Sequence, residues 1–135
     1  MTATPTYLAD RYPPKTLARA RRAMRCAPFS RSLYEELQER GVPLTTIAGV
    51  AGVSRGFTTT AIAELPAEDE LLWLSMVGIL RREVDGQGIT DSFRLTPLGR
   101  ILLTEWREQG TVWLSPVSGV DRLRNGARRW LRSPF

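Results

Sequence analysis

Arginine is the residue type with the clearest chemical capacity in this sequence. Nineteen lysines and arginines stand against fourteen aspartates and glutamates in 135 residues, so the formal net charge is +5. Most of the arginines occur in groups, at 19–25, 81–82 and 122–132. A guanidinium group binds phosphates and carboxylates through several N–H donors. The excess of positive charge therefore favours an anionic partner, such as nucleic acid or an anionic membrane surface.

The side chains that carry most enzymatic and metal chemistry are scarce. The sequence has no histidine, and Cys26 is its only cysteine. A common zinc site, a Cys–His nucleophile pair and a disulfide within the chain are therefore excluded. Carboxylates such as Glu35 and Glu36 are better explained by a helix cap and a solvated face than by acid–base catalysis. We expect no catalytic residue, no metal, no cofactor and no enzymatic activity.

Length and composition predict one globular domain with tails. A chain of 135 residues with 42% hydrophobic and 24% charged residues is typical of a single folded domain. No apolar run approaches the roughly 18 residues of a membrane span, and the opening MTATPTYLADRYPP lacks the layout of a secretory signal. We expect a cytoplasmic protein with no integral membrane association.

We expect a folded domain with a different kind of segment at each end of the chain. Residues 1–13 have no helical or strand period and predict a flexible N-terminal arm. Residues 14–110 contain the periodic segments. Residues 111–135 predict a connector followed by a basic amphipathic helix, which could contact DNA, lie on a membrane surface or dock on a protein.

The sequence predicts that the domain begins with two helices. Apolar spacing predicts a basic helix over residues 15–26 and a second over 32–40. Ser32 and Glu35 have the spacing of a capping box at the start of the second helix, and Gly41 is expected to end it with a positive φ.

The second half of the domain predicts a core helix, a hairpin and a closing helix. Pro66 opens a helix with acidic residues in its first turn, and the apolar run LLWLSMVGIL at 71–80 should be enclosed on several sides. The turn DGQGITD separates two short strand-like segments. Thr96 and Pro97 then begin a helix that Gly110 ends.

Residues 47–54 resemble the helix-turn-helix of bacterial repressors. The segment IAGVAGVS matches the I-A-x-x-A-G-V-S pattern, in which the alanine allows close helix approach, the glycine supplies the turn and the serine caps the second helix. Downstream, LLWLSMVGILRRE and FRLTPLGRILL resemble the segment that ends many winged helices. The resemblance covers about residues 32–106. It implies a mainly α fold with a small β-hairpin, namely a winged helix-turn-helix with extra N- and C-terminal helices.

Two further resemblances bear on function. The helix order and the L-T-P-L-G-R segment are also similar to the N-terminal winged-helix dimerisation domain of small-molecule O-methyltransferases, which does not read DNA. More loosely, through RREVDGQGITDSFRLTPLGR, the chain resembles a family of small uncharacterised proteins from oxygenic photosynthetic bacteria. That resemblance implies a fold and no activity.

The first function that fits is a DNA-binding transcriptional regulator or chromosome-associated factor, expected to be a homodimer on double-stranded DNA. The helix-turn-helix resemblance implies a recognition helix at 54–65, presenting Arg55, Thr58 and Thr59 to base edges. Phosphate contacts are expected from the first helix and the hairpin, namely from Arg19, Arg22, Arg25, Arg82 and Arg94. The alternative for these arginines is a solvated face.

The second function that fits is a protein-interaction or dimerisation adaptor that uses a winged-helix fold without reading DNA. If the helix after Pro66 holds the recognition position, its acidic first turn would repel phosphates. Trp73, Trp113 and Trp130 are candidate partner anchors because aromatic residues concentrate interface energy. Helical spacing favours a core position for Trp73 and Met76 as well.

Overall fold

The structure is a computed structural model that describes residues 12–114 and Asn125. This part of the chain is mainly helical, as predicted, with a small three-stranded antiparallel sheet. The helices are α2 (Pro14–Cys26), α3 (Arg31–Glu39), α4 (Leu44–Ile47), α5 (Gly49–Ser54), α6 (Glu64–Met76) and α7 (Pro97–Gln109), with a 3₁₀ turn, η1 (Gly110–Trp113), after α7. The strands are β1 (Val42–Pro43), β2 (Leu80–Asp85) and β3 (Gly88–Leu95).

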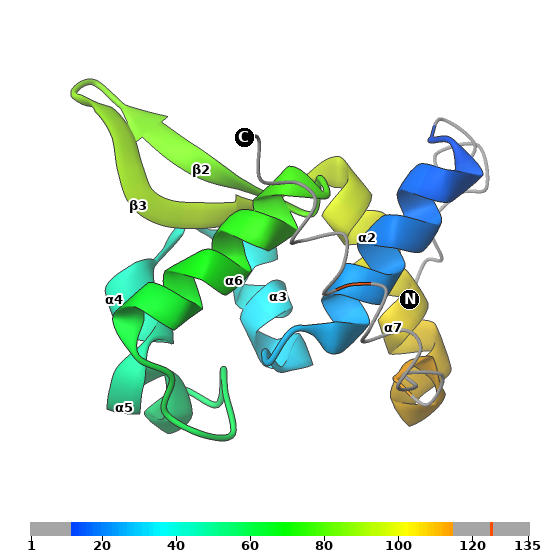
Figure 1. The fold of residues 1–135 in the computed structure, drawn as a ribbon, viewed down its shortest axis with the longest axis horizontal. Coiled ribbons are helices and arrows are strands. Elements are labelled where there is room, and N and C mark those ends of the chain that lie inside the picture. Colours follow the sequence, from blue (N-terminus) through cyan, green and yellow to red (C-terminus); the bar gives the residue numbers. More distant parts are fainter. Residues whose placement is uncertain (1–11, 115–124, 126–135) are drawn as a thin grey trace.

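Helix α6 lies across the middle of the molecule (Figure 1). The β2–β3 hairpin projects on one side of it, α4 and α5 lie near its first turn, and α2 and α7 lie at the opposite end of the molecule. Its buried residues Ala67, Leu71 and Leu74 face a core shared with α3 and the sheet. The core therefore sits beneath α6 and leaves the other side of this helix at the surface.

The predicted hairpin is confirmed, with a bend that the sequence pattern did not indicate. Strand β3 pairs with β2 through Leu80↔Leu95 near the body and Val84↔Ile89 near the tip, and the register shifts between these pairs. The Thr90 hydroxyl donates to the Glu83 carbonyl across this shift. Beyond the bend, the hairpin extends away from the core (Figure 1).

The third strand, β1, was not predicted. It has two residues and pairs with β3 through Val42↔Phe93 and Pro43↔Ser92, which gives the strand order β1-β3-β2. A strand this short has no measurable period, so only its pairing reveals it.

The closing helix follows its sequence signals. Thr96 is the N-cap of α7, and its side-chain oxygen accepts a hydrogen bond from the Gly99 N–H at 3.0 Å. Pro97 occupies the first turn, and Gly110 ends the helix with φ 61°. These signals depend on neighbouring residues alone, which is why the sequence predicted them correctly.

The predicted recognition helix at 54–65 is wrong. Helix α5 ends at Ser54, and the chain then turns at Gly56, whose φ is 77°. Phe57 enters the core, and its carbonyl accepts a hydrogen bond from the Ser30 N–H at 2.9 Å. The Ser30 and Ser32 hydroxyls both donate to the Gly56 carbonyl. These long-range contacts hold an irregular loop in place of a helix whose glycine and threonines are weak helix formers.

The predicted capping box and glycine C-cap of α3 are also wrong. Ser30, not Ser32, is the N-cap residue, and its side chain makes no capping hydrogen bond because both hydroxyls donate to the Gly56 carbonyl. The helix ends at Glu39, its C-cap residue Arg40 is extended, and Gly41 does not have a positive φ. A Cβ at Gly41 would meet the Glu83 carboxylate, so this glycine allows the hairpin to approach.

Helix α6 is displaced from its predicted position towards the N-terminus. It begins at Glu64, two residues before Pro66, and ends at Met76, because Gly78 turns the chain with φ 93°. Ile79 and Leu80 remain buried, and Leu80 begins strand β2. The apolar run at 71–80 therefore serves two elements.

Candidate interaction surface

The residues expected to contact bases do not form a reading surface. Arg55 and Thr59 are exposed, but they lie in the loop after α5 and not on a helix. Thr58 is 5% exposed, and its hydroxyl has no hydrogen-bond partner among the described residues. Thr58 is therefore a core residue, which is a correction to its predicted position.

Two of the arginines expected to contact phosphate form ion pairs within the chain. Arg82 contacts Glu68 of α6 at 2.9 Å, and Arg94 contacts Glu83 at 3.3 Å. Arg94 also donates to the Glu39 carbonyl. These guanidinium groups tie the hairpin to the helical body.

The other three predicted phosphate contacts lie on α2, where Arg19, Arg22 and Arg25 are half-buried. Arg25 donates to the Trp113 carbonyl at 2.7 Å and lies over the Trp113 ring, 4.9 Å from its centroid. Helix α2, the hairpin and the loop after α5 occupy separate regions of the molecule (Figure 1). The structure therefore places the predicted DNA contacts on three separate elements.

The described tryptophans proposed as partner anchors are core residues. Trp73 is 3% exposed and Trp113 is 0% exposed. Trp113 stacks on Trp106 with a centroid separation of 4.8 Å, and the Trp73 Nε1–H donates to Asn125 Oδ1 at 2.9 Å. Trp130 lies outside the described residues. Aromatic residues are common in cores and interfaces alike, so residue type alone did not separate the two roles.

Exposed apolar side chains occur on the outer side of α6. Leu65 is 78% exposed and Met76 is 53% exposed. Asp69, which is exposed, and Leu72, which is half-buried, lie between them at helical spacing. These four residues, Leu65, Asp69, Leu72 and Met76, are called the α6 face below.

The charge of α6 is entirely negative. The helix contains Glu64, Glu68, Asp69 and Glu70 and no basic residue. Glu68 is held by Arg82, so the nearest arginine on the hairpin is already engaged. The α6 face thus combines apolar side chains with the carboxylate of Asp69, on a helix that carries only negative charge.

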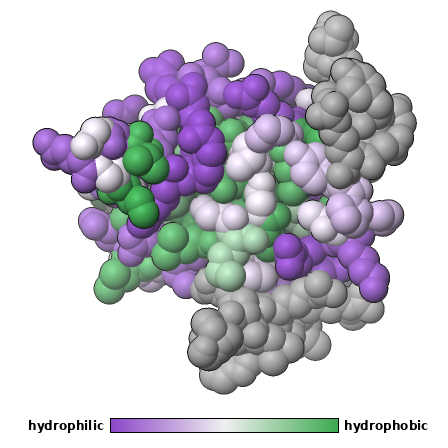
Figure 2. Space-filling model, turned by 90° about the horizontal axis from the view of Figure 1, so that it is seen from above, coloured by the Kyte–Doolittle hydropathy of each residue, from purple (hydrophilic) through white to green (hydrophobic). Residues whose placement is uncertain are grey.

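The projecting hairpin also exposes apolar side chains. Val84 and Ile89 are direct cross-strand neighbours and are 70% and 72% exposed. Seen from above, the molecule shows such apolar side chains surrounded by hydrophilic ones (Figure 2). Because α6 packs against β2, the hairpin forms one border of the region around the α6 face.

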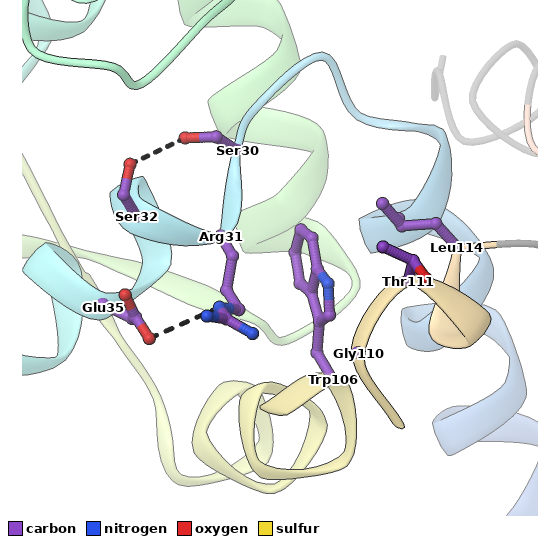
Figure 3. A pocket seen from close by; sticks show the side chains of 8 residues that line it. All are labelled: Ser30, Arg31, Ser32, Glu35, Trp106, Gly110, Thr111 and Leu114. Carbon is purple, nitrogen blue, oxygen red and sulfur yellow. Dashed lines mark hydrogen bonds and ion pairs between the residues drawn. The ribbon is translucent and has the colours of Figure 1, made fainter. Parts of the chain in front are cut away.

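A separate hollow lies between the start of α3 and the end of α7 (Figure 3). Its volume is about 460 Å³, and it is lined by Ser30, Arg31, Ser32, Glu35, Trp106, Gly110, Thr111 and Leu114. Its polar groups engage one another, since Arg31 pairs with Glu35 at 3.5 Å and the Ser30 and Ser32 hydroxyls lie 2.9 Å apart.

The sequence patterns missed the α6 face for an identifiable reason. The run at 71–80 is apolar on all sides, which predicted an enclosed helix. Starting the helix at Glu64 would have placed Leu65, Asp69, Leu72 and Met76 on one stripe. Their exposure depends on which neighbours pack on α6, and spacing cannot show that.

The chain matches the family model described as Npun_F0494-like over residues 10–129. The chain belongs to the Npun_F0494-like family. No curated protein and no solved structure matches it.

The match to the Npun_F0494-like family gives no evidence for the winged-helix superfamily. The match extends from before α2 to beyond Asn125, so the whole described fold belongs to the family pattern. Among the described residues, no helix is long and apolar enough to cross a bilayer.

Proposed function

We propose that this protein is a non-enzymatic interaction module that uses a winged-helix fold to bind another protein and does not read DNA. The order of the elements supports the winged-helix assignment: α3, the α4–α5 pair and α6 precede the β2–β3 hairpin, and α7 follows it. The family match is compatible with this assignment and carries no activity of its own.

The observation that carries the proposal is the character of α6. This helix directly precedes the hairpin and packs against both α4 and β2, which is the position of a recognition helix. A helix that reads DNA brings positive or neutral polar side chains to a polyanion. Helix α6 instead has four carboxylates and no basic residue. Its placement against DNA would be opposed by charge repulsion.

The α6 face has the composition of a protein-binding surface. Leu65 and Met76 provide exposed apolar area at the two ends of the helix, and methionine adapts to irregular partner surfaces. Asp69 lies between them and gives this face a negative charge. A second copy of this chain is one possible partner, which keeps the predicted homodimer within the proposal.

The proposal is tested by comparing surface variants of the full chain. Leu65→Ser with Met76→Ser removes the apolar area of the α6 face, and Val112→Ser removes a 63% exposed valine on η1 as the matched control. We expect affinity capture followed by mass spectrometry to recover a stoichiometric partner with wild type and with the control, and not with the α6 variant. Light scattering of the same samples shows whether the partner is a second copy.

The DNA alternative is decided on the same proteins. Fluorescence anisotropy of a random duplex at two salt concentrations should show no binding that depends on α6. Two results together would contradict the proposal and restore a DNA-binding function: the duplex binds at low salt and more weakly at high salt, and Arg55→Glu reduces this binding.

A further inference from the structure

We infer that the hollow between α3 and α7 binds a small carboxylate with an apolar body. Its lining comes from the start of α3, the end of α7 and the turn that follows, so it is separate from the α6 face. The inference goes beyond the proposed function and does not rest on it. Three observations lead to it: an indole N–H without a partner, a positive environment, and a cavity of suitable size and lining.

The first observation concerns the indole N–H of Trp106. The indole N–H groups of Trp73 and Trp113 each donate to a side-chain oxygen, whereas that of Trp106 has no hydrogen-bond partner among the described residues. Trp106 is only 6% exposed, yet it lines the hollow. Its nitrogen points to the side of the hollow formed by Thr111 and Leu114 (Figure 3). A tryptophan N–H buried to this extent usually has an acceptor, which here must enter from the hollow.

The direction of this N–H is fixed by packing. The Trp106 ring stacks on Trp113 with a centroid separation of 4.8 Å, and Tyr34 lies against it at 5.8 Å. Tyr34 and Trp113 are themselves completely buried. The indole therefore cannot turn to find another acceptor, and a donor that is already oriented costs little conformational entropy when a ligand binds.

The second observation is that the start of α3 provides a positive environment. The N-cap residue Ser30 makes no side-chain capping bond, and the first turn of α3 holds no acidic residue. The free N–H groups and the helix dipole both favour an anion at such a helix start. The guanidinium group of Arg31, which can only donate hydrogen bonds, lines the hollow at the same place.

The carboxylate of Glu35 in the lining is already neutralised. Its Oε2 lies 3.2 Å from Arg107 Nε and 3.5 Å from Arg31 Nε. The contact with Arg31 is the longer one, and Arg107 remains beside Glu35 if Arg31 turns to a ligand. Two arginines and one glutamate leave a formal charge of +1, which matches a ligand with one negative charge.

The third observation is the size and lining of the hollow. Its volume is about 460 Å³, and sites for small molecules typically measure about 300–1,000 Å³. Trp106, Gly110 and Leu114 provide apolar surface for the body of the ligand, while the polar groups named above fix its charged end. This division between an apolar lining and a few oriented donors is typical of small-molecule sites.

The test is an NMR titration of the full chain, labelled with nitrogen-15, with phenylacetate as the probe. The Trp106 indole signal, assigned through its contacts with Trp113 and Tyr34, should shift in a saturable way, and the Trp73 indole signal should not. The alcohol 2-phenylethanol has a similar body without the charge and should bind at least about fivefold more weakly. Acetate, which has the charge without the body, should give no saturable shift.

Two variants of exposed arginines on α3 separate a ligand contact from a general charge effect. Arg31→Gln should weaken phenylacetate binding at least about fivefold and leave 2-phenylethanol binding unchanged. The matched control is Arg40→Gln, which removes an i,i+4 pair with Glu36 at the other end of α3 and should bind as wild type does. Thermal melts of both variants verify that they are folded.

Three results would overturn the inference. They are the lack of a saturable shift at Trp106, equal affinity for phenylacetate and 2-phenylethanol, and equal phenylacetate affinity in the Arg31→Gln and Arg40→Gln proteins. Because the titration needs no protein partner and no residue of α6, each of these results leaves the proposed function standing.

Discussion

At the scale of single residues, Gly52 shows how one position determines a helix junction. It is buried in α5. A Cβ added at this position would lie 2.8 Å from the carbonyl carbon of Ile47 and 3.2 Å from Thr58 Oγ1. The turn that the repressor-like pattern assigned to Gly52 is made by Gly49, whose φ is 67°. Gly52 instead permits α4 and α5 to pack closely.

Gly52→Ala is expected to destabilise the fold. Because the added methyl group meets backbone that cannot rotate away, we expect the free energy of unfolding to fall by about 1–3 kcal/mol. Urea denaturation followed by circular dichroism measures the change. The control is Gly86→Ala in the exposed hairpin turn, where the new Cβ meets nothing within 4 Å. Equal urea midpoints for the two variants would contradict this expectation, because they would mean that α4 and α5 can move apart without loss of stability.

At the scale of elements, an ion pair joins the first and last helices of the described domain. Arg21 of α2 donates two hydrogen bonds to Glu105 of α7, both at 2.9 Å, and the Trp113 Nε1–H donates to the same carboxylate at 3.3 Å. Burial acts to raise the pKa of Glu105, but the hydrogen bond and charge of Arg21, with help from Trp113 and Arg25, lower it overall. The carboxylate therefore stabilises the folded state in its ionised form.

Glu105→Gln should weaken this junction in a pH-dependent way. A pKa that is lower in the folded than in the unfolded state stabilises the protein above the unfolded pKa, and this stability is lost as the pH falls through the folded value. The difference in unfolding free energy from wild type should be about 1–2 kcal/mol at pH 7 and should shrink below about pH 4.

Urea titrations at pH 7, 5 and 3 measure the effect of Glu105→Gln. The control is Glu36→Gln, which removes an exposed i,i+4 pair with Arg40 and should change stability by less than about 0.5 kcal/mol. A Glu105→Gln effect that is independent of pH would mean that the charge of Glu105 does not contribute.

At the scale of the whole molecule, the hairpin divides into a buried base and an exposed tip. The pair Leu80↔Leu95 is 2% exposed on both sides, whereas Val84 and Ile89 are 70% and 72% exposed. The register shift between Arg82 and Val84 separates the two parts. The tip can therefore open without disturbing the core.

Native-state hydrogen exchange should show this division. Opening of the tip exposes little buried apolar surface, so the amides of Val84 and Ile89 should exchange at least tenfold faster than those of Leu80 and Leu95. Exchange followed by NMR measures both groups in one experiment. Uniform protection along the hairpin would show that it opens only as one unit with the core.

The fold could be predicted where local chemistry decides it. The cap at Thr96, the proline at 97, the glycine at 110 and the hairpin around its Gly-rich turn all depend on residues a few positions apart, and the structure confirms each of them. The same holds for the basic helix α2. Composition likewise established the lack of histidine and the net positive charge.

The remainder depends on contacts between residues far apart in the sequence. Residues 54–65 match a repressor pattern, but their conformation is decided by hydrogen bonds from Ser30 and Ser32 and by the burial of Phe57. Which side of α6 is exposed to solvent depends on which elements pack against its other sides. Sequence alone therefore determined the two ends of α7, the basic helix α2 and the turn of the hairpin. Only the tertiary structure decided which of their faces meet solvent, because burial is a property of the packed chain.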